Sequence, residues 1–99
     1  MIQERELMIH LLDYYGELLT ETQLSVMKLY YEDDLGFSEI AENRNVSRNA
    51  VHDMIKTCDA LLVEYEKKLA LYQKWLRRKA LIEEYKQTKN ELLLEELED

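Results

Sequence analysis

Turn-forming residues are scarce in this sequence. It contains no proline and only two glycines, Gly16 and Gly36, among 99 residues. Strand-rich folds need many more turn residues than this, so the scarcity predicts an all-α protein. Hydrophobic residues make up 46% of the chain, which is enough for a folded core and excludes a largely disordered protein.

Cysteine, histidine and long apolar runs are equally scarce. The single Cys58 excludes an intramolecular disulfide. His10, His52 and Cys58 lack the spacing of a zinc site, and there is no glycine-rich phosphate loop, so we predict no metal, no cofactor and no enzymatic activity. No apolar run approaches the roughly 20 residues that span a membrane. The first residues carry charges where a signal peptide would be apolar, so we expect a cytoplasmic protein without a membrane partner.

Positive charge is in deficit over most of the chain, whose formal net charge is -8. Residues 20–58 hold seven acids and four bases, a net charge of -3. Proteins that bind nucleic acid usually carry a basic excess, because neutralisation of phosphates supplies most of the affinity. The exception is the stretch "KKLALYQKWLRRK", residues 67–79, which holds six bases and no acid.

The N-terminal third predicts two helices. Apolar positions give a first helix from about Gln3 to Tyr15, with Gly16 near its end. Thr20 starts a second helix, and Gln23 lies three residues on, as in a capping box. We interpret the tyrosine pairs 14–15 and 30–31 as core residues with hydroxyls that reach the surface.

The stretch "FSEIAENRNVSRNAVHDMIK", residues 37–56, predicts two short helices around a tight turn. Asn45 stands where the turn needs a left-handed backbone, which asparagine tolerates. We expect Val46 to plug the turn, Ser47 to cap the second helix, and Val51 and Ile55 to face inward. In the first helix Gly36 serves as N-cap with Glu39 three residues on, and Phe37, Ile40 and Ala41 are expected to face inward.

The C-terminal half predicts a long helix. No clear stop signal follows Arg48, so helix is expected to about Lys86, with or without a break near residues 57–59. Thr88 and Glu91 suggest a new capping box and a short terminal helix, "ELLLEELED". We therefore divide the chain into a helix-turn-helix domain, 1–60, and a helical extension, 61–99, that packs on it and on a partner chain.

Two apolar stripes run along the predicted long helix, about 130° apart at roughly 100° per residue. One comprises Leu62, Tyr65, Leu69, Tyr72 and Leu76. The other comprises Leu71, Trp75, Ile82 and Tyr85. The first stripe can cover the helix-turn-helix core, and the second needs a cover of its own. We predict that it forms the seam of a homodimer.

Residues 19–69 carry a family resemblance. The pattern L-T-x-x-Q, LYY-x-x-DL, S-E-I-A-E, V-S-R-x-A-V and a trailing L-L-x-x-Y-E is similar to the YlxM/p13 family, UPF0122. The helix-turn-helix part alone resembles region 4 of bacterial sigma factors. The resemblance implies a small regulatory or accessory protein of the signal recognition particle pathway, with the particle's protein or RNA as partner. The alternative is a DNA-binding transcriptional regulator.

The outward residues of the second helix of the motif are the candidates for DNA contact: Arg48, Asn49, His52 and Lys56. Arg48 and Lys56 could reach phosphates and Asn49 an adenine edge. Asp53 faces the same way, and Glu32, Asp33 and Asp34 crowd the nearby loop. The acidic surroundings favour a solvated face on an inherited scaffold, with DNA contact and protein contact as alternatives.

The basic stretch is the best candidate for RNA contact. Lys67, Lys74, Arg77 and Arg78 fall within about 100° of one another on a continuous helix. Tyr72 and Trp75 lie between them, and aromatic rings can stack on unpaired bases. The alternative, a solvated flank whose aromatics pack internally or at the dimer seam, is the commoner role for such a stretch.

Overall fold

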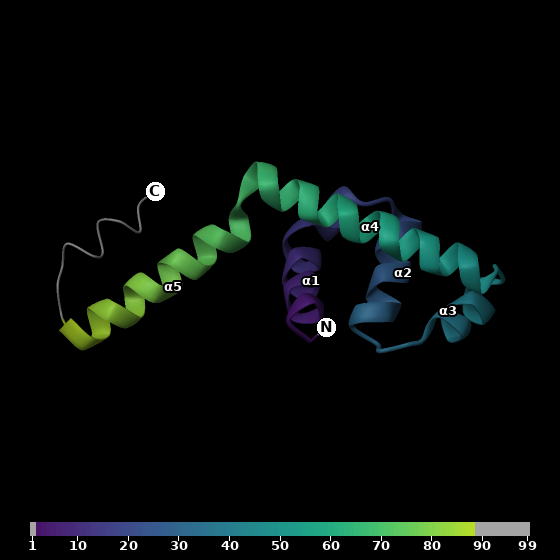
Figure 1. Cartoon of the computed structure of the whole chain (residues 1–99), viewed down its shortest axis with the longest axis horizontal. Coiled ribbons are helices and arrows are strands. Elements are labelled where there is room, and N and C mark those ends of the chain that lie inside the picture. The colour runs from purple at the N-terminus through teal and green to yellow at the C-terminus, as the bar shows by residue number, and fades with distance from the viewer. Residues whose placement is uncertain (1, 89–99) are drawn as a thin grey trace. The chain divides into compact units, whose positions relative to one another are not determined.

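The computed structural model describes residues 2–88, and over this range the chain is all-α, as predicted (Figure 1). The helices are α1 (Ile2–Tyr15), η1 (Gly16–Leu18, a 3-10 turn), α2 (Glu21–Tyr31), α3 (Phe37–Arg44), α4 (Arg48–Leu69) and α5 (Leu71–Thr88). The short terminal helix expected after Thr88 lies outside the described residues.

The chain divides into two compact units between Leu69 and Ala70. Helix α4 ends there because Ala70 has a left-handed backbone, with φ of 54°. Helix α4 is unbroken through residues 57–59, so both versions of the predicted long helix are wrong: the break lies at Ala70. This conformation costs alanine roughly 1–2 kcal/mol, and alanine is otherwise a good helix former, so the break at Ala70 could not be predicted from the sequence. The predicted packing of residues 61–99 on the helix-turn-helix stays a prediction.

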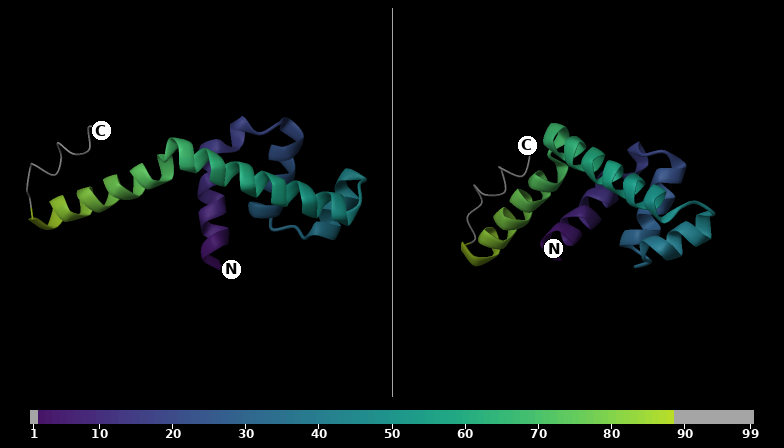
Figure 2. Two further views of the ribbon diagram at one scale, coloured as in Figure 1. Left: turned by 45° about the horizontal axis from the view of Figure 1, so that its top comes forward. Right: turned by 45° about the vertical axis from the view of Figure 1, so that its right-hand side comes forward.

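One face of α4 forms the floor of the core in the first unit. Helices α1, α2 and α3 all pack on α4, with α3 near its N-terminal end and α1 near its C-terminal half (Figures 1 and 2). The buried residues of α4 follow helical spacing: Val51, Ile55, Cys58 and Leu62. They meet Leu11, Met27 and Ile40, which are also fully buried. The predicted inward positions Val51 and Ile55 are thus confirmed, and Cys58 is a core residue.

Two tyrosines tie α1 and α2 to α4. The ring of Tyr15 is 1% exposed, and its hydroxyl donates to Glu66 Oε1 at 2.7 Å. Tyr31 is also buried and donates to Asp59 Oδ1 at 2.9 Å. The prediction of buried tyrosines holds for the second member of each pair, whereas Tyr14 is 37% exposed. Each buried ring therefore ends in a polar contact that fixes its helix on α4.

The turn of the motif follows the sequence at most positions. Asn45 is left-handed, with φ 57° and ψ 46°, and the Ser47 hydroxyl accepts a hydrogen bond from the Ala50 N–H at 3.0 Å. The Gly36 N–H donates to Glu39 Oε1 at 3.1 Å. Val46 was expected to plug the turn, and this is wrong: it is 50% exposed, because the buried Ile40 and Ala41 already fill the space between α3 and α4.

The start of α2 also follows its prediction. The Thr20 hydroxyl accepts from the Gln23 N–H at 3.2 Å, and the Gln23 side chain accepts from the Thr20 N–H at 3.0 Å. This reciprocal capping box satisfies two N–H groups that the first turn of a helix leaves without intrahelical partners.

We predict that Ser47→Ala lowers the free energy of unfolding by about 1 kcal/mol, because the first turn of α4 loses its side-chain cap. Urea unfolding followed by circular dichroism measures this. Ser38→Ala in α3, which removes an exposed hydroxyl, is the matched control and should change stability little. Equal losses in the two variants would show that the cap at Ser47 contributes nothing.

Candidate interaction surfaces

The outward face of the first turns of α4 is exposed, as the sequence predicts. Arg48, Asn49, His52 and Lys56 are all exposed on this helix. Asp53 shares the surface with an 81% exposed side chain. The motif therefore presents the positions that would enter a DNA groove, with a carboxylate among them.

The Phe37 ring contacts two of these residues, Arg48 and His52. The Arg48 guanidinium lies over the Phe37 ring, with Cζ 5.4 Å from the ring centroid. The His52 ring meets Phe37 edge-on at 5.2 Å. Phe37 in turn stacks on Tyr30 at 5.3 Å, so it is half-buried rather than fully inward as expected. A DNA phosphate would have to compete with these contacts for Arg48.

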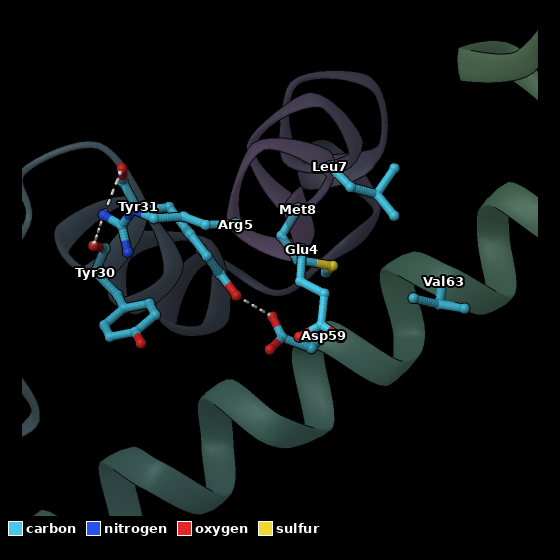
Figure 3. A pocket seen from close by; sticks show the side chains of 8 residues that line it. All are labelled: Glu4, Arg5, Leu7, Met8, Tyr30, Tyr31, Asp59 and Val63. Carbon is cyan, nitrogen blue, oxygen red and sulfur yellow. Dashed lines mark hydrogen bonds between the residues drawn. The ribbon is translucent and has the colours of Figure 1, made fainter. Parts of the chain in front are cut away.

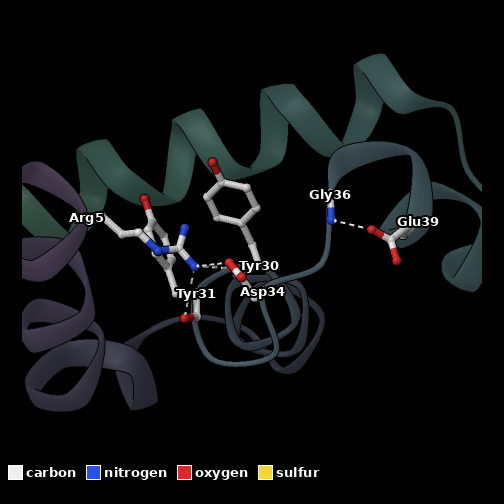
Figure 4. A network of polar contacts seen from close by, with 6 residues as sticks. All are labelled: Arg5, Tyr30, Tyr31, Asp34, Gly36 and Glu39. Atoms are coloured by element: carbon white, nitrogen blue, oxygen red, sulfur yellow. Dashed lines mark hydrogen bonds and ion pairs between the residues drawn. The ribbon is translucent and has the colours of Figure 1, made fainter. Parts of the chain in front are cut away.

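Arg5 binds the C-terminal end of α2 (Figure 4). This role was not predicted from the sequence. Its Nη2 donates to the carbonyls of Tyr30 and Tyr31 at 3.2 and 3.3 Å and to Asp34 Oδ1 at 2.8 Å. The guanidinium also lies 5.5 and 5.4 Å from the two tyrosine ring centroids. The last carbonyls of a helix carry partial negative charge, so a cation there is stabilising. Only the isolated arginine in an acidic segment could have signalled this role.

An open groove of about 730 Å³ lies between α1, the end of α2 and α4 (Figure 3). Its lining residues are Glu4, Arg5, Leu7, Met8, Tyr30, Tyr31, Asp59 and Val63. Leu7, Met8 and Val63 form an apolar side, and Val63 is 37% exposed. In Figure 3 the Arg5 side chain extends toward the end of α2, while Glu4 extends toward Asp59. The groove thus combines apolar and acidic groups, and no pattern in the sequence predicts it.

Burial raises the pKa of two residues that line the groove, Asp59 and Tyr31, and of the neighbouring Cys58. Desolvation raises the pKa of Asp59, although the hydrogen bond from Tyr31 opposes the rise. Desolvation and the same hydrogen bond raise the pKa of Tyr31 far above its usual range, so it stays a donor. Burial, followed by the nearby Asp59 charge, raises the pKa of Cys58. The thiol is therefore protonated at neutral pH and behaves as a small core residue.

Helix α5 brings aromatic and basic residues together, but without Lys67. Tyr72 and Trp75 stack with centroids 5.8 Å apart and an interplanar angle of 19°. Lys79 Nζ lies 5.2 Å from the Trp75 ring centroid. Lys67 belongs to α4, on the other side of the break. The prediction that Lys67 shares one face of a continuous helix with the other three bases is therefore wrong. Lys74, Arg77 and Arg78 remain on one helix.

The predicted seam residues all lie on α5. Leu71 is 40% exposed, Trp75 36% and Ile82 40%, while Tyr85 is half-buried. At about 100° per residue, Leu71, Trp75 and Ile82 fall within about 40° of one another, with Lys74 and Lys79 to either side. The first predicted stripe is divided by the break: Leu62 and Tyr65 belong to α4, and Tyr72 and Leu76 to α5.

Residues 2–88 also bear on metal binding and membrane insertion. Over this range no three histidine, cysteine, aspartate or glutamate side chains are grouped to hold a metal ion. In the same part of the chain no helix has the length and apolar character needed to cross a membrane.

We predict that Asp59→Asn stabilises the protein at neutral pH. Because the folded-state pKa of Asp59 is raised, ionised Asp59 lowers stability as pH rises from its ordinary value of 3.8 through the raised value. The gain from the amide should be present at pH 7 and should vanish at pH 3, where both states are protonated. Thermal unfolding at the two pH values measures it. A gain of the same size at pH 3 would contradict this explanation.

Comparisons with known proteins agree with this architecture. A family model described as "Putative helix-turn-helix protein, YlxM / p13 like" (UPF0122) matches residues 2–98. A UPF0122 protein of Clostridium acetobutylicum is 47% identical over 85 residues, covering 86% of this chain and 73% of the relative. One of Clostridium botulinum is 56% identical over 72 residues, covering 73% and 66%. One of Bacillus cereus is 49% identical over 87 residues, covering 88% and 79%. The chain therefore belongs to the UPF0122 family of YlxM/p13-like helix-turn-helix proteins.

Proposed function

We propose that this protein is a cytoplasmic regulatory or accessory protein of the signal recognition particle pathway that acts through protein or RNA contact. The family resemblance suggests the pathway. The charge of the first unit is the main observation against DNA binding by the helix-turn-helix. Residues 1–69 hold fourteen acids and seven bases, a net charge of -7. Such a unit repels a phosphate backbone over long distances.

The state of the second helix of the motif supports the same choice. Arg48 and His52 already contact Phe37, and Asp53 projects from the same surface. A helix that reads DNA needs cations free to reach phosphates and no carboxylate facing them. The scaffold of a DNA-binding motif is thus combined with a surface unsuited to DNA.

Helix α5 is the proposed site of RNA contact. It holds five bases and two acids, a net charge of +3, and carries the stacked Tyr72–Trp75 pair. Bases supply attraction to phosphates, and the ring of Tyr72, which lies outside the seam proposed below, can stack on an unpaired nucleotide. Lys67 contributes charge from the end of α4.

We predict that changing Lys67, Lys74, Arg77 and Arg78 together to glutamate abolishes binding to the RNA of the signal recognition particle. The reason is the loss of phosphate attraction and the repulsion that replaces it. Fluorescence anisotropy with labelled RNA measures this. Circular dichroism checks that the helices remain. Glu83→Gln and Glu84→Gln, on the same helix, are controls that should not weaken binding. Unchanged RNA binding by the fourfold variant would contradict the assignment.

DNA binding by a transcriptional regulator is the second candidate, favoured by the exposure of Arg48, Asn49, His52 and Lys56. The same anisotropy assay with a random pool of duplex DNA separates the candidates. A tight complex with one sequence near physiological salt, lost in Arg48→Ala, would favour the regulator. Weak binding to all duplexes, unchanged by Arg48→Ala, is the result we expect.

We also propose a homodimer whose seam is Leu71, Trp75, Ile82 and Tyr85. Burial of a large apolar side chain contributes roughly 1.5–3 kcal/mol, so removal of Trp75 should be decisive. We predict that Trp75→Glu is monomeric where the parent is dimeric in sedimentation equilibrium at micromolar concentration. Gln73→Glu, on the same helix outside the stripe, is the matched control. A parent monomer, or a Trp75→Glu dimer, would contradict the seam.

A further inference from the structure

The groove between α1, the end of α2 and α4 plays no part in the proposed RNA contact, and its lining residues suggest a different ligand. Its apolar side consists of Leu7, Met8 and Val63, contributed by α1 and α4. Its volume of about 730 Å³ can hold several side chains, which is far more than a single ion needs. It is also open, so an occupant can enter from one side without unfolding the unit.

Asp59 is the polar centre of this groove. Its carboxylate accepts a hydrogen bond from Tyr31, and among residues 2–88 no cationic side chain lies within ion-pair distance of it. A half-buried carboxylate without a cation is unfavourable, and an added cation would relieve the desolvation cost. Arg5 does not fill this role because its guanidinium binds Asp34 and the last carbonyls of α2.

The other residues that line the groove also favour a basic partner. Glu4 adds a second carboxylate from α1, and Figure 3 shows its side chain extending toward Asp59. Tyr30 also lines the groove, and tyrosine is enriched at protein interfaces. The surrounding unit carries the net charge of -7, which attracts a basic partner before contact.

We propose that this groove docks a basic amphipathic helix of a partner protein. Apolar side chains of the partner pack on Leu7 and Val63, beside the largely buried Met8, and a lysine or arginine pairs with Asp59. Charge complementarity selects this occupant over an acidic or neutral helix. The inference does not depend on the signal recognition particle, because it concerns the chemistry of the partner and not its pathway.

The probes are two synthetic amphipathic peptides with the same leucine stripe, one with lysines and one with glutamates on the polar face. Each carries fluorescein and is titrated with the full chain, with anisotropy as the readout. The lysine peptide should bind and the glutamate peptide should not. Equal binding of both, or no binding of the lysine peptide up to about 1 mM, overturns the proposal.

Variants locate the binding. Asp59→Asn keeps the shape of the side chain and removes its charge, and Val63→Lys places a cation on the apolar side of the groove. Asp59→Asn should weaken the lysine peptide about tenfold, which is the effect of losing one partly buried charged contact. Val63→Lys should weaken it at least as much, because it removes apolar contact and repels the lysines of the peptide. Glu64→Gln, the next position on α4 and outside the groove lining, removes the same charge and should change affinity less than about twofold.

Other occupants give other results. Spermidine that binds as tightly as the lysine peptide, and is weakened by Asp59→Asn but not by Val63→Ser, which removes apolar surface and adds no charge, would replace the helix with a small polycation. If the chain sediments as an oligomer and the lysine peptide dissociates it, a second copy of this chain occupies the groove. Either outcome overturns the proposal. Circular dichroism of each variant confirms that a loss of affinity is not a loss of folding.

Discussion

The burial of one stripe of α4 is the interaction on which the first unit depends. Val51, Ile55, Cys58 and Leu62 are at most 4% exposed, and every other helix of the unit packs on α4. Each large apolar side chain buried there contributes roughly 1.5–3 kcal/mol, whereas a helix cap contributes about 1 kcal/mol. The stripe therefore holds the helices together, and the caps at Thr20 and Ser47 decide where the helices begin. The helix-turn-helix and the groove are two consequences of the same packing.

This packing leaves the two faces of the unit with different chemistry. Near the N-terminal end of α4, Phe37 holds Arg48 and His52 at the surface of the motif. Farther along α4, Tyr31 and Asp59 form the centre of an acidic, partly apolar groove. A motif that could approach DNA is thus built into a unit whose total charge opposes DNA. Helix α5 carries a net charge of +3, which is why we propose that α5 and the groove attract different classes of partner.

Residue types with strong local preferences made much of the fold predictable. Asn45, Ser47 and the Thr20–Gln23 pair act within a few residues of chain, so the sequence alone placed them correctly. Val51 and Ile55 followed from helical spacing. Ala70 could not be predicted, because alanine normally continues a helix and only its surroundings hold it left-handed. Arg5 and Asp59 were missed for another reason: each has partners 25 or more residues away, and no local pattern announces such contacts.

On the proposals above, the helix-turn-helix scaffold binds its partners through α5 and the groove, and not through the exposed start of α4. Residue-resolved NMR of the full chain, with purified signal recognition particle and the lysine peptide as separate titrants, tests this claim directly. Amide signals of α5 should broaden or shift when the particle is added, and those of Leu7, Asp59 and Val63 should shift when the lysine peptide is added. Those of Arg48, Asn49 and His52 should stay in place in both titrations. Perturbation confined to Arg48, Asn49 and His52, or a spectrum that the particle leaves unchanged, would contradict the account.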